Sequence, residues 1–432
     1  MPIFKSGVNP VSQIQSSSIN QLAQRANPTS PSHSSSSLPL PGQGLSRYIH
    51  FNADQSGCGF WRMIWPANEM LAYNKAVVMT SYQMVLDPNF YKTIDAVKLQ
   101  RQCTESQYRF VKHLRKVSDE IKKAQGKTFK ILWEVDDLVC PVEDIPNYNR
   151  CKEAFTNPQI QDTVKRIVNL CDEMTCVSER MADHYRTHIS YDKISVIPNY
   201  LPKTWISNFY DEKKLISDFE TNKSKGKIKI GYAGSGTHFD VQNKTGQRDD
   251  FWHVLRDVIK YVDDYEFVFI GGFPLNLRPY VTDGRMKFYP WTNILDYPKM
   301  MHDLDIQVMI APLATNSFTE SKSDIKMLES YALGRPCICQ DLPCYSNSFL
   351  KFKTGDELFD QIKHVTKDLD TYLDYSRKSR NYVESLWLSD HLDEFNLVYN
   401  TPYGDESRKL NDSFLKHNAK QFKVKDDPVY YV

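Results

Sequence analysis

The chain has 432 residues, which exceeds one ordinary hydrophobic core and predicts two domains of roughly 150 to 200 residues each plus a tail. Hydrophobic residues make up 41% and charged residues 25% of the sequence, and no apolar run approaches the roughly 18 to 20 residues of a membrane span. The 54 basic and 53 acidic residues leave a formal net charge of +1, which disfavours a dedicated nucleic-acid-binding protein.

The first segment, residues 1–45, is rich in Ser, Pro, Gln and Asn and has little apolar surface to offset the entropy of ordering. We therefore expect a disordered arm, either a solubilising leader or a docking tail. Its start has no basic stretch followed by an apolar one, so we expect no secretory signal and a cytoplasmic location. The nine cysteines stand without CxxC spacing, which indicates reduced structural thiols.

Strand-like and helix-like runs alternate through residues 46–210. A glycine-rich turn follows the first strand, and a helical pattern of apolar residues over 106–125 stops at Gly126. This alternation predicts a parallel α/β sheet. The expected strands are Arg47–Asn52, Ala76–Thr80, Ala96–Gln100, Phe129–Val135, Glu173–Val177 and Ile194–Asn199.

A polar stretch, 211–226, is expected to link this lobe to a second one, 227–385, in which the same alternation restarts. The segment 386–432 is expected to contribute a helix and tail that pack back across both lobes. Two doubly wound, Rossmann-like lobes would place a ligand cleft at the carboxyl ends of their strands. The expected strands of the second lobe are Lys227–Ala233, Tyr265–Gly271, Ile306–Ala311 and Pro336–Cys339.

The most informative motif is the segment Thr319–Pro336, which follows the strand ending at Ala311. Ser323 is a suitable N-cap for a helix that carries Lys326 and Glu329 in its first two turns. Free amides and the helix dipole attract anions there, and Lys322 adds a second cation, so a diphosphate would bind at this end. Glu329, one turn further on, could accept hydrogen bonds from ribose hydroxyls. The alternative is an ordinary surface helix with an exposed Lys-Glu pair.

Two segments resemble a known family. Glu329–Pro336 resembles the second-glutamate segment of GT-B glycosyltransferases of the family-four, "glycosyl transferases group 1" kind. Val177–Arg186 followed by Ile194–Tyr200 resembles the close of that family's N-terminal lobe. The resemblance implies two facing Rossmann-like lobes, a nucleotide-sugar donor on the C-terminal lobe, an acceptor on the N-terminal lobe, and anomer-retaining transfer.

The chain departs from that family in two places and looks like a divergent subgroup of a type found in tailed phages. The family has two glutamates separated by seven residues. In this chain Glu329 takes the place of the second glutamate, and Ser321 takes the place of the first. Glu320, next to Ser321, is the candidate catalytic carboxylate. The family's Arg and Lys phosphate pair is missing, since the loop reads Gly231-Tyr-Ala-Gly-Ser-Gly-Thr-His238. We expect three residues of this loop to contact the donor phosphates, with the histidine as a hydrogen-bond donor: Gly234, Ser235 and His238.

The turn after the first strand, Gly57-Cys-Gly-Phe-Trp-Arg62, stands where the family has its glycine-rich loop. Without Cβ atoms, Gly57 and Gly59 would let the backbone approach the diphosphate, and Arg62 could stabilise the leaving group. The alternative is a packing turn.

Asp136 and Asp137 follow the strand that ends at Val135. Such a pair could hold a metal on a nucleotide sugar, as in the other large glycosyltransferase fold. In a GT-B enzyme the same position faces the acceptor, where either carboxylate could orient or deprotonate the attacking hydroxyl. A helix cap or surface ion pair is the third alternative. We expect no metal and no cofactor.

Together these features predict a hexosyl- or pentosyltransferase that uses a nucleotide-sugar donor. The acceptor could be a hydroxymethylated pyrimidine in phage DNA, with the enzyme in the host cytoplasm, or a surface polysaccharide, a lipid-linked sugar or a protein. A non-catalytic nucleotide-sugar or nucleic-acid binding protein, and an epimerase on the same scaffold, stay open as alternatives of other classes.

Overall fold

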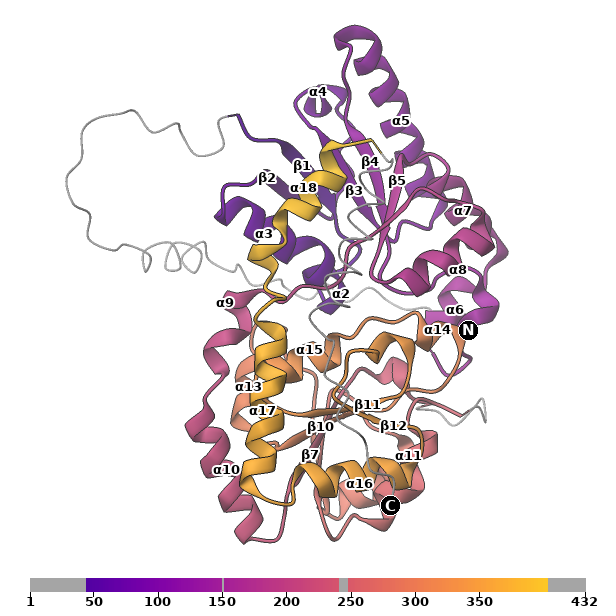
Figure 1. Cartoon of the computed structure of the whole chain (residues 1–432). Helices are drawn as coiled ribbons and strands as arrows, with labels where there is room; N and C mark the ends of the chain where they lie inside the picture. Colours follow the sequence, from indigo (N-terminus) through magenta and orange to yellow (C-terminus); the bar gives the residue numbers. More distant parts are fainter. Residues whose placement is uncertain (1–43, 150, 241–247, 403–432) are drawn as a thin grey trace, which may run out of the picture. The chain divides into compact units, whose positions relative to one another are not determined.

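The computed structural model describes residues 44–149, 151–240 and 248–402 (Figure 1). Nearly all of the arm expected over 1–45 and the end of the tail expected over 386–432 lie outside these ranges. Two sheets of six parallel strands each organise the described residues. The expected α/β class with two doubly wound sheets is confirmed. Among the described residues, no helix has the length and apolar character needed to span a membrane.

The N-terminal sheet has the strand order β2-β1-β3-β4-β5-β6. Its chain order reverses between β1 and β3, and doubly wound sheets bind ligands outside the carboxyl ends of the strands at such a point. Every residue of β3 is buried, because helices cover both faces of a parallel sheet. The strands are β1 (Arg47–Phe51), β2 (Val77–Ser81), β3 (Ala96–Gln100), β4 (Lys130–Glu134), β5 (Glu173–Cys176) and β6 (Ile194–Val196).

The C-terminal sheet has the order β12-β11-β10-β7-β8-β9, the arrangement of dinucleotide-binding folds, and it reverses between β7 and β10. Its edge strands β9 and β12 are absent from the sequence-based prediction. Three of the four residues of β9 are exposed, so the strand lacks a buried run, and β12 has only three residues. The strands are β7 (Lys229–Ala233), β8 (Glu266–Ile270), β9 (Met286–Tyr289), β10 (Val308–Ala311), β11 (Cys337–Gln340) and β12 (Leu350–Phe352).

Helices connect the strands in both halves. Those of the N-terminal half are α2 (Gly57–Gly59), η1 (Phe60–Ile64), α3 (Trp65–Ala72), α4 (Pro88–Tyr91), α5 (Glu105–Gln125), η2 (Val142–Asp144), α6 (Cys151–Phe155), α7 (Pro158–Val168), α8 (Glu179–Ile189), α9 (Lys203–Ile206) and η3 (Ser207–Phe209). Those of the C-terminal half are α10 (Glu212–Ser224), η4 (Gly236–His238), α11 (Trp252–Lys260), η5 (Leu275–Leu277), α12 (Arg278–Thr282), α13 (Tyr297–Asp303), α14 (Ser317–Glu320), α15 (Ile325–Ala332), η6 (Pro343–Tyr345), α16 (Gly355–Val365), α17 (Leu369–Val383), η7 (Leu388–Asp390) and α18 (Leu392–Asn400).

The stretch 211–226, expected as a linker, is mostly the helix α10. The Asp211 side chain caps it by accepting a hydrogen bond from the Lys214 amide at 3.1 Å. Leu215 and Phe219 are buried on its inner face. Most of the other side chains of α10 are polar or charged, so the composition hides a helix that has one apolar side.

The last described helix, α18, packs against the N-terminal sheet although it follows the C-terminal one in the chain (Figure 1). The rings of Tyr399 and Tyr48 meet edge to face at 4.8 Å between centroids, and the Tyr48 hydroxyl donates to Asn396 Oδ1 at 3.0 Å. One hydrophobic cluster therefore contains residues of both halves, whereas each sheet also has a core of its own.

Candidate functional site

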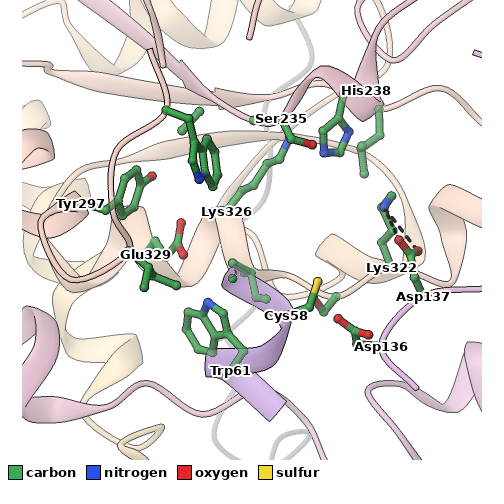
Figure 2. A pocket seen from close by; sticks show the side chains of 18 of the residues that line it. Cys58, Trp61, Asp136, Asp137, Ser235, His238, Tyr297, Lys322, Lys326 and Glu329 are labelled. Atoms are coloured by element: carbon green, nitrogen blue, oxygen red, sulfur yellow. Dashed lines mark hydrogen bonds and ion pairs between the residues drawn. The ribbon is translucent and has the colours of Figure 1, made fainter. Parts of the chain in front are cut away.

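A cavity of about 240 Å³ is lined by loops that follow the carboxyl ends of strands in both sheets (Figure 2). These are the segments after β1, β4, β7, β9, β10 and β11, together with α15. This is where a doubly wound sheet binds ligands. Ten of the thirteen residues predicted for the site from the sequence line it: Gly57, Asp136, Asp137, Gly234, Ser235, His238, Lys322, Ser323, Lys326 and Glu329.

The cations of the cavity lie at the start of α15. Lys326 Nζ donates to the Tyr232 hydroxyl at 3.0 Å and lies 4.4 Å from the centroid of its ring. Burial lowers the pKa of Lys326 to about 8. Lys322 Nζ lies 3.4 Å from both carboxylate oxygens of Asp137 and 4.4 Å from the centroid of the Phe318 ring. Two amines thus line the cavity near the start of α15, and positive charge close to a helix start favours a diphosphate.

The helix begins two residues after the predicted cap. Asp324 occupies the N-cap position, without a hydrogen bond from the helix to its side chain, and Ile325 is the first helical residue. The prediction of Ser323 as N-cap is therefore wrong, although Ser323 lines the cavity. Because no side chain caps the helix start, the free amides of α15 remain available to a ligand.

Glu329 lies at the other end of the cavity, beside Tyr297 and Trp61 (Figure 2). Burial raises the pKa of Glu329 to about 8, although Tyr297, Lys326 and Trp61 oppose that rise. Tyr297 comes from the start of α13 and Trp61 from η1. Tyr297 was not predicted for the site, because a tyrosine at a helix start carries no signal of its own.

His238 is held by Asp250, which was also not predicted for the site. Its Nδ1 lies 2.6 Å from Asp250 Oδ2, while Asp250 Oδ1 accepts hydrogen bonds from the Tyr148 hydroxyl at 2.5 Å and the Ala314 amide at 3.0 Å. Burial, together with Lys326, lowers the pKa of His238 to about 4. Despite burial, the hydrogen bonds from His238 and Tyr148 lower the pKa of Asp250, so the carboxylate is ionised.

This arrangement changes the role predicted for His238. A carboxylate only accepts, so we assign the proton of the neutral imidazole to Nδ1, and Nε2 carries the lone pair. His238 therefore offers an acceptor, which suits a sugar hydroxyl better than a phosphate oxygen. The predicted donor role is corrected accordingly.

Two glycines in loops beside the cavity, Gly234 and Gly271, are tightly packed. A Cβ on Gly234 would lie 2.5 Å from the Tyr232 hydroxyl oxygen, so only glycine fits beside that ring. Gly271 has φ of +85°, and a Cβ there would lie 2.4 Å from the indole of Trp291, which lines the cavity. Close packing at both glycines thus shapes one wall.

Asp136 and Asp137 each face a basic side chain. Arg101 Nε lies 3.5 Å from Asp136 Oδ1 and also pairs with Asp54, and Lys322 faces Asp137. Burial raises the pKa of Asp137. Arg101 was not predicted for the site, since a lone arginine after a strand resembles an ordinary surface residue.

Three predicted site residues do not line the cavity. Arg62 is 2% exposed and pairs with Glu134 at 2.7 Å, with Lys98 on the other carboxylate oxygen at 2.8 Å. The guanidinium is thus committed to a buried ion network, and its predicted contact to the leaving group is corrected.

The other two residues outside the cavity are Gly59 and Glu320, and the site roles predicted for them are corrected as well. A Cβ on Gly59 would lie 2.0 Å from the carbonyl oxygen of Asp54, and the Gly59 amide donates to Asp54 Oδ1 at 3.0 Å, so this glycine serves packing. Glu320 pairs with Arg180 at 2.7 Å outside the cavity. Ser321, at the family's first glutamate position, is 1% exposed and donates to the Ser317 carbonyl at 2.8 Å.

No protein-family model matches the chain. No curated protein matches it. Among solved structures, Anabaena Alr3699/HepE in complex with UDP-glucose is similar, with a TM-score of 0.52 and 10% identity over 81% of this chain and 98% of that one. The same protein in complex with UDP and glucose gives a TM-score of 0.51 and 10% identity over 82% of this chain and 99% of that one. With two doubly wound sheets and a pocket at the carboxyl ends of the strands of both, the chain has the GT-B fold.

Proposed function

We propose that the protein is a glycosyltransferase that binds a nucleotide-sugar donor in this cavity. The observation that carries the proposal is the grouping of Lys322, Lys326 and the uncapped start of α15 in one cavity, with Glu329 one turn further along. Amides and ammonium groups at a helix start suit a diphosphate, and a carboxyl group beyond them suits ribose hydroxyls. The similar fold of a protein that binds UDP-glucose supports the same class of ligand.

The donor's orientation follows from the two ends of the cavity (Figure 2). The nucleoside would lie toward Glu329 and Trp61, and the sugar toward His238 and Asp137, with the diphosphate between them at Lys326. Charge on the leaving diphosphate would then develop against fixed cations and amides. His238 Nε2 would accept a hydrogen bond from a sugar hydroxyl.

We propose anomer-retaining transfer without a metal on the diphosphate. Retention rests on the family resemblance alone. The metal-free donor site is supported by the ion pairs described above, since Asp136 faces Arg101 and Asp137 faces Lys322. The lysines would supply the positive charge that a divalent ion supplies elsewhere.

The acceptor stays a separate proposal. Hydroxymethylated pyrimidine in phage DNA is one candidate, and a polysaccharide, a lipid-linked sugar or a protein are the others. Three aromatic residues after β1 could stack on a flipped base, but Trp61 and Trp65 belong to a hydrophobic cluster and Phe60 packs against it. Trp61 also lies beside Glu329. These positions do not favour DNA over the other acceptors.

The test is to incubate the full chain with a panel of nucleotide sugars, with and without chelator, and to measure release of the nucleoside diphosphate. DNA with hydroxymethylcytosine or with plain cytosine is added in parallel, and nucleoside mass is followed. Release that survives chelator and falls in Lys326→Ala, but not in the control Lys299→Ala on the exposed face of α13, supports the proposal. Equal release by wild type and Lys326→Ala would contradict it.

A second candidate is a nucleotide-sugar binding protein without turnover. Ser321 favours it, because the first family glutamate is replaced by a buried hydroxyl that bonds to its own helix. Donor binding by calorimetry without any diphosphate release in the same panel would select this candidate.

A further inference from the structure

Two histidines and one carboxylate meet on the N-terminal half, and none of them lines the donor cavity. His184 and His188 stand one turn apart on α8, and Asp144 ends η2. Asp144 Oδ2 lies 3.3 Å from His184 Nε2 and 3.7 Å from His188 Nε2, and the two imidazole centroids are 4.3 Å apart. One ligand atom from each residue lies within 4.8 Å of the other two.

His184 is the most constrained of the three. Its side chain is 9% exposed, and its Nε2 has no hydrogen-bond partner. A hydrogen bond to the backbone of Cys140 therefore uses the other ring nitrogen, Nδ1. A carbonyl only accepts, so Nδ1 carries a proton.

The contact between His184 and Asp144 leaves a ring nitrogen that a cation can bind. His184 Nε2 is buried without a hydrogen-bond partner and lies 3.3 Å from a carboxylate oxygen of Asp144. A metal ion accepts electron pairs from a ring nitrogen and a carboxylate oxygen at once.

The spacing fits a small tetrahedral ion. With zinc bonds of about 2.0 to 2.1 Å, neighbouring ligand atoms of a tetrahedral site are roughly 3.3 Å apart. The separation of His184 Nε2 from Asp144 Oδ2 is 3.3 Å, and small side-chain rotations of the half-exposed His188 would bring it to the same range. The hydrogen bond from Nδ1 to a backbone carbonyl is the support that metal-bound histidines commonly have.

We propose that Asp144, His184 and His188 bind a divalent transition-metal ion, Zn²⁺ in the first place, with water in the fourth position. The site joins α8 to the loop that leaves β4. This loop begins near Asp137 in the donor cavity and runs to Tyr148, which donates to Asp250. The metal would therefore hold the loop that carries these two residues, and its binding does not depend on the proposed glycosyl transfer.

The full chain, stripped with chelator and dialysed, is titrated with Zn²⁺ and separately with Co²⁺. We expect one equivalent of metal to bind, Co²⁺ d–d absorption without thiolate charge-transfer bands, and a rise in the thermal midpoint with Zn²⁺. His188→Ala and Asp144→Asn, at partly exposed positions, should lower the affinity at least about tenfold while the far-ultraviolet spectrum stays unchanged. His184→Ala should abolish binding.

The control is His113→Ala, an exposed histidine on α5 that contacts the Leu86 carbonyl. It should bind Zn²⁺ like the wild type. The proposal is overturned if the stripped wild type binds no Zn²⁺, or if His188→Ala and Asp144→Asn bind it as tightly as the wild type does. Thiolate bands that persist in those variants would likewise overturn it, because the free cysteines would then hold the metal.

Discussion

Two side chains of the donor cavity, Lys326 and Glu329, have pKa values of about 8, although one is a base and the other an acid. Burial is the main cause in both cases, since it disfavours the charged form of each. Near neutral pH, Glu329 is therefore mostly protonated and uncharged, whereas Lys326 is mostly protonated and charged until the pH approaches about 8. A bound diphosphate would favour the protonated amine. The charge of the site is therefore sensitive to mild alkali.

Donor affinity should fall as pH rises above about 8, by up to about tenfold per pH unit, because Lys326 loses its proton there and diphosphate binding must restore it. Lys326→Arg should flatten this profile, since a guanidinium stays charged. Calorimetric titration of the donor between about pH 6.5 and 9.5 checks both. An unchanged fall in Lys326→Arg would assign the effect to Glu329 instead.

The two glycines after β1 should respond differently to alanine. A Cβ on Gly57 meets no atom within 4 Å and would project from the cavity wall, whereas a Cβ on Gly59 would lie 2.0 Å from the Asp54 carbonyl oxygen. Gly57→Ala should raise the donor KM several-fold with an unchanged thermal midpoint. Gly59→Ala should cost about 1 to 3 kcal/mol of stability in urea unfolding. The reverse pattern would contradict the packing role of Gly59.

Asp250→Asn tests the assignment of the His238 proton. An amide can donate to Nδ1 and so stabilise the other tautomer. Nε2 would then carry the proton and could no longer accept a hydrogen bond from the sugar hydroxyl. We expect kcat to fall about 10- to 100-fold with a native circular dichroism spectrum. Asp264→Asn, at an exposed position outside the cavity, is the matched control. Full activity of Asp250→Asn would show that His238 takes no part in transfer.

At the scale of elements, the buried network of Arg62, Lys98 and Glu134 fixes η1 against β3 and β4. Glu134 is fully buried, and despite that burial Arg62 and Lys98 lower its pKa. Arg62 Nη1 also donates to the Ile197 carbonyl at 2.7 Å, close to the end of β6. This network therefore supports the glycine turn and Trp61 from the side away from the cavity. A binding site needs such support to keep its side chains in a fixed position.

Arg62→Ala should reduce the free energy of unfolding by about 3 to 5 kcal/mol, because Glu134 loses one of its two cations in a dry environment. The donor KM of the folded fraction should rise only a few-fold, because the glycine turn and Trp61 lose part of their support while Arg62 itself does not line the cavity. Urea unfolding and steady-state kinetics measure the two effects, with Arg278→Ala on the exposed side of α12 as control. Lost activity with an unchanged urea midpoint would restore the leaving-group role first predicted for Arg62.

Sequence patterns predicted the central strands of the sheets well and the edge strands of the C-terminal sheet poorly. β3 matches its predicted bounds, Ala96–Gln100, because all five of its residues are buried between the helices on the two faces of the sheet. β9 was missed because its side chains are largely exposed. The cavity's cations and Glu329 follow from one local motif that spans the start of α15. Asp250 and Tyr297 come from separate segments, and their approach depends on tertiary packing that no local pattern reports.

At the scale of the whole molecule, several contacts join the two sheets around the cavity. Tyr148 donates to Asp250, Ser178 Oγ donates to the Ser321 carbonyl at 3.2 Å, and Phe318 of α14 lies in the core of the N-terminal sheet. These contacts join the two halves beside the cavity. In the proposed reaction, keeping water away from the reacting carbon would favour transfer over hydrolysis.

The most direct measurement is a crystal structure of the full chain grown with the nucleotide sugar that gives turnover in the panel. The diphosphate should lie about 3 Å from Lys326 Nζ and the first amides of α15, with the ribose at Glu329 and the sugar beside His238. Density for the donor elsewhere on the molecule, or in this cavity with its diphosphate away from α15, would contradict the proposed donor site.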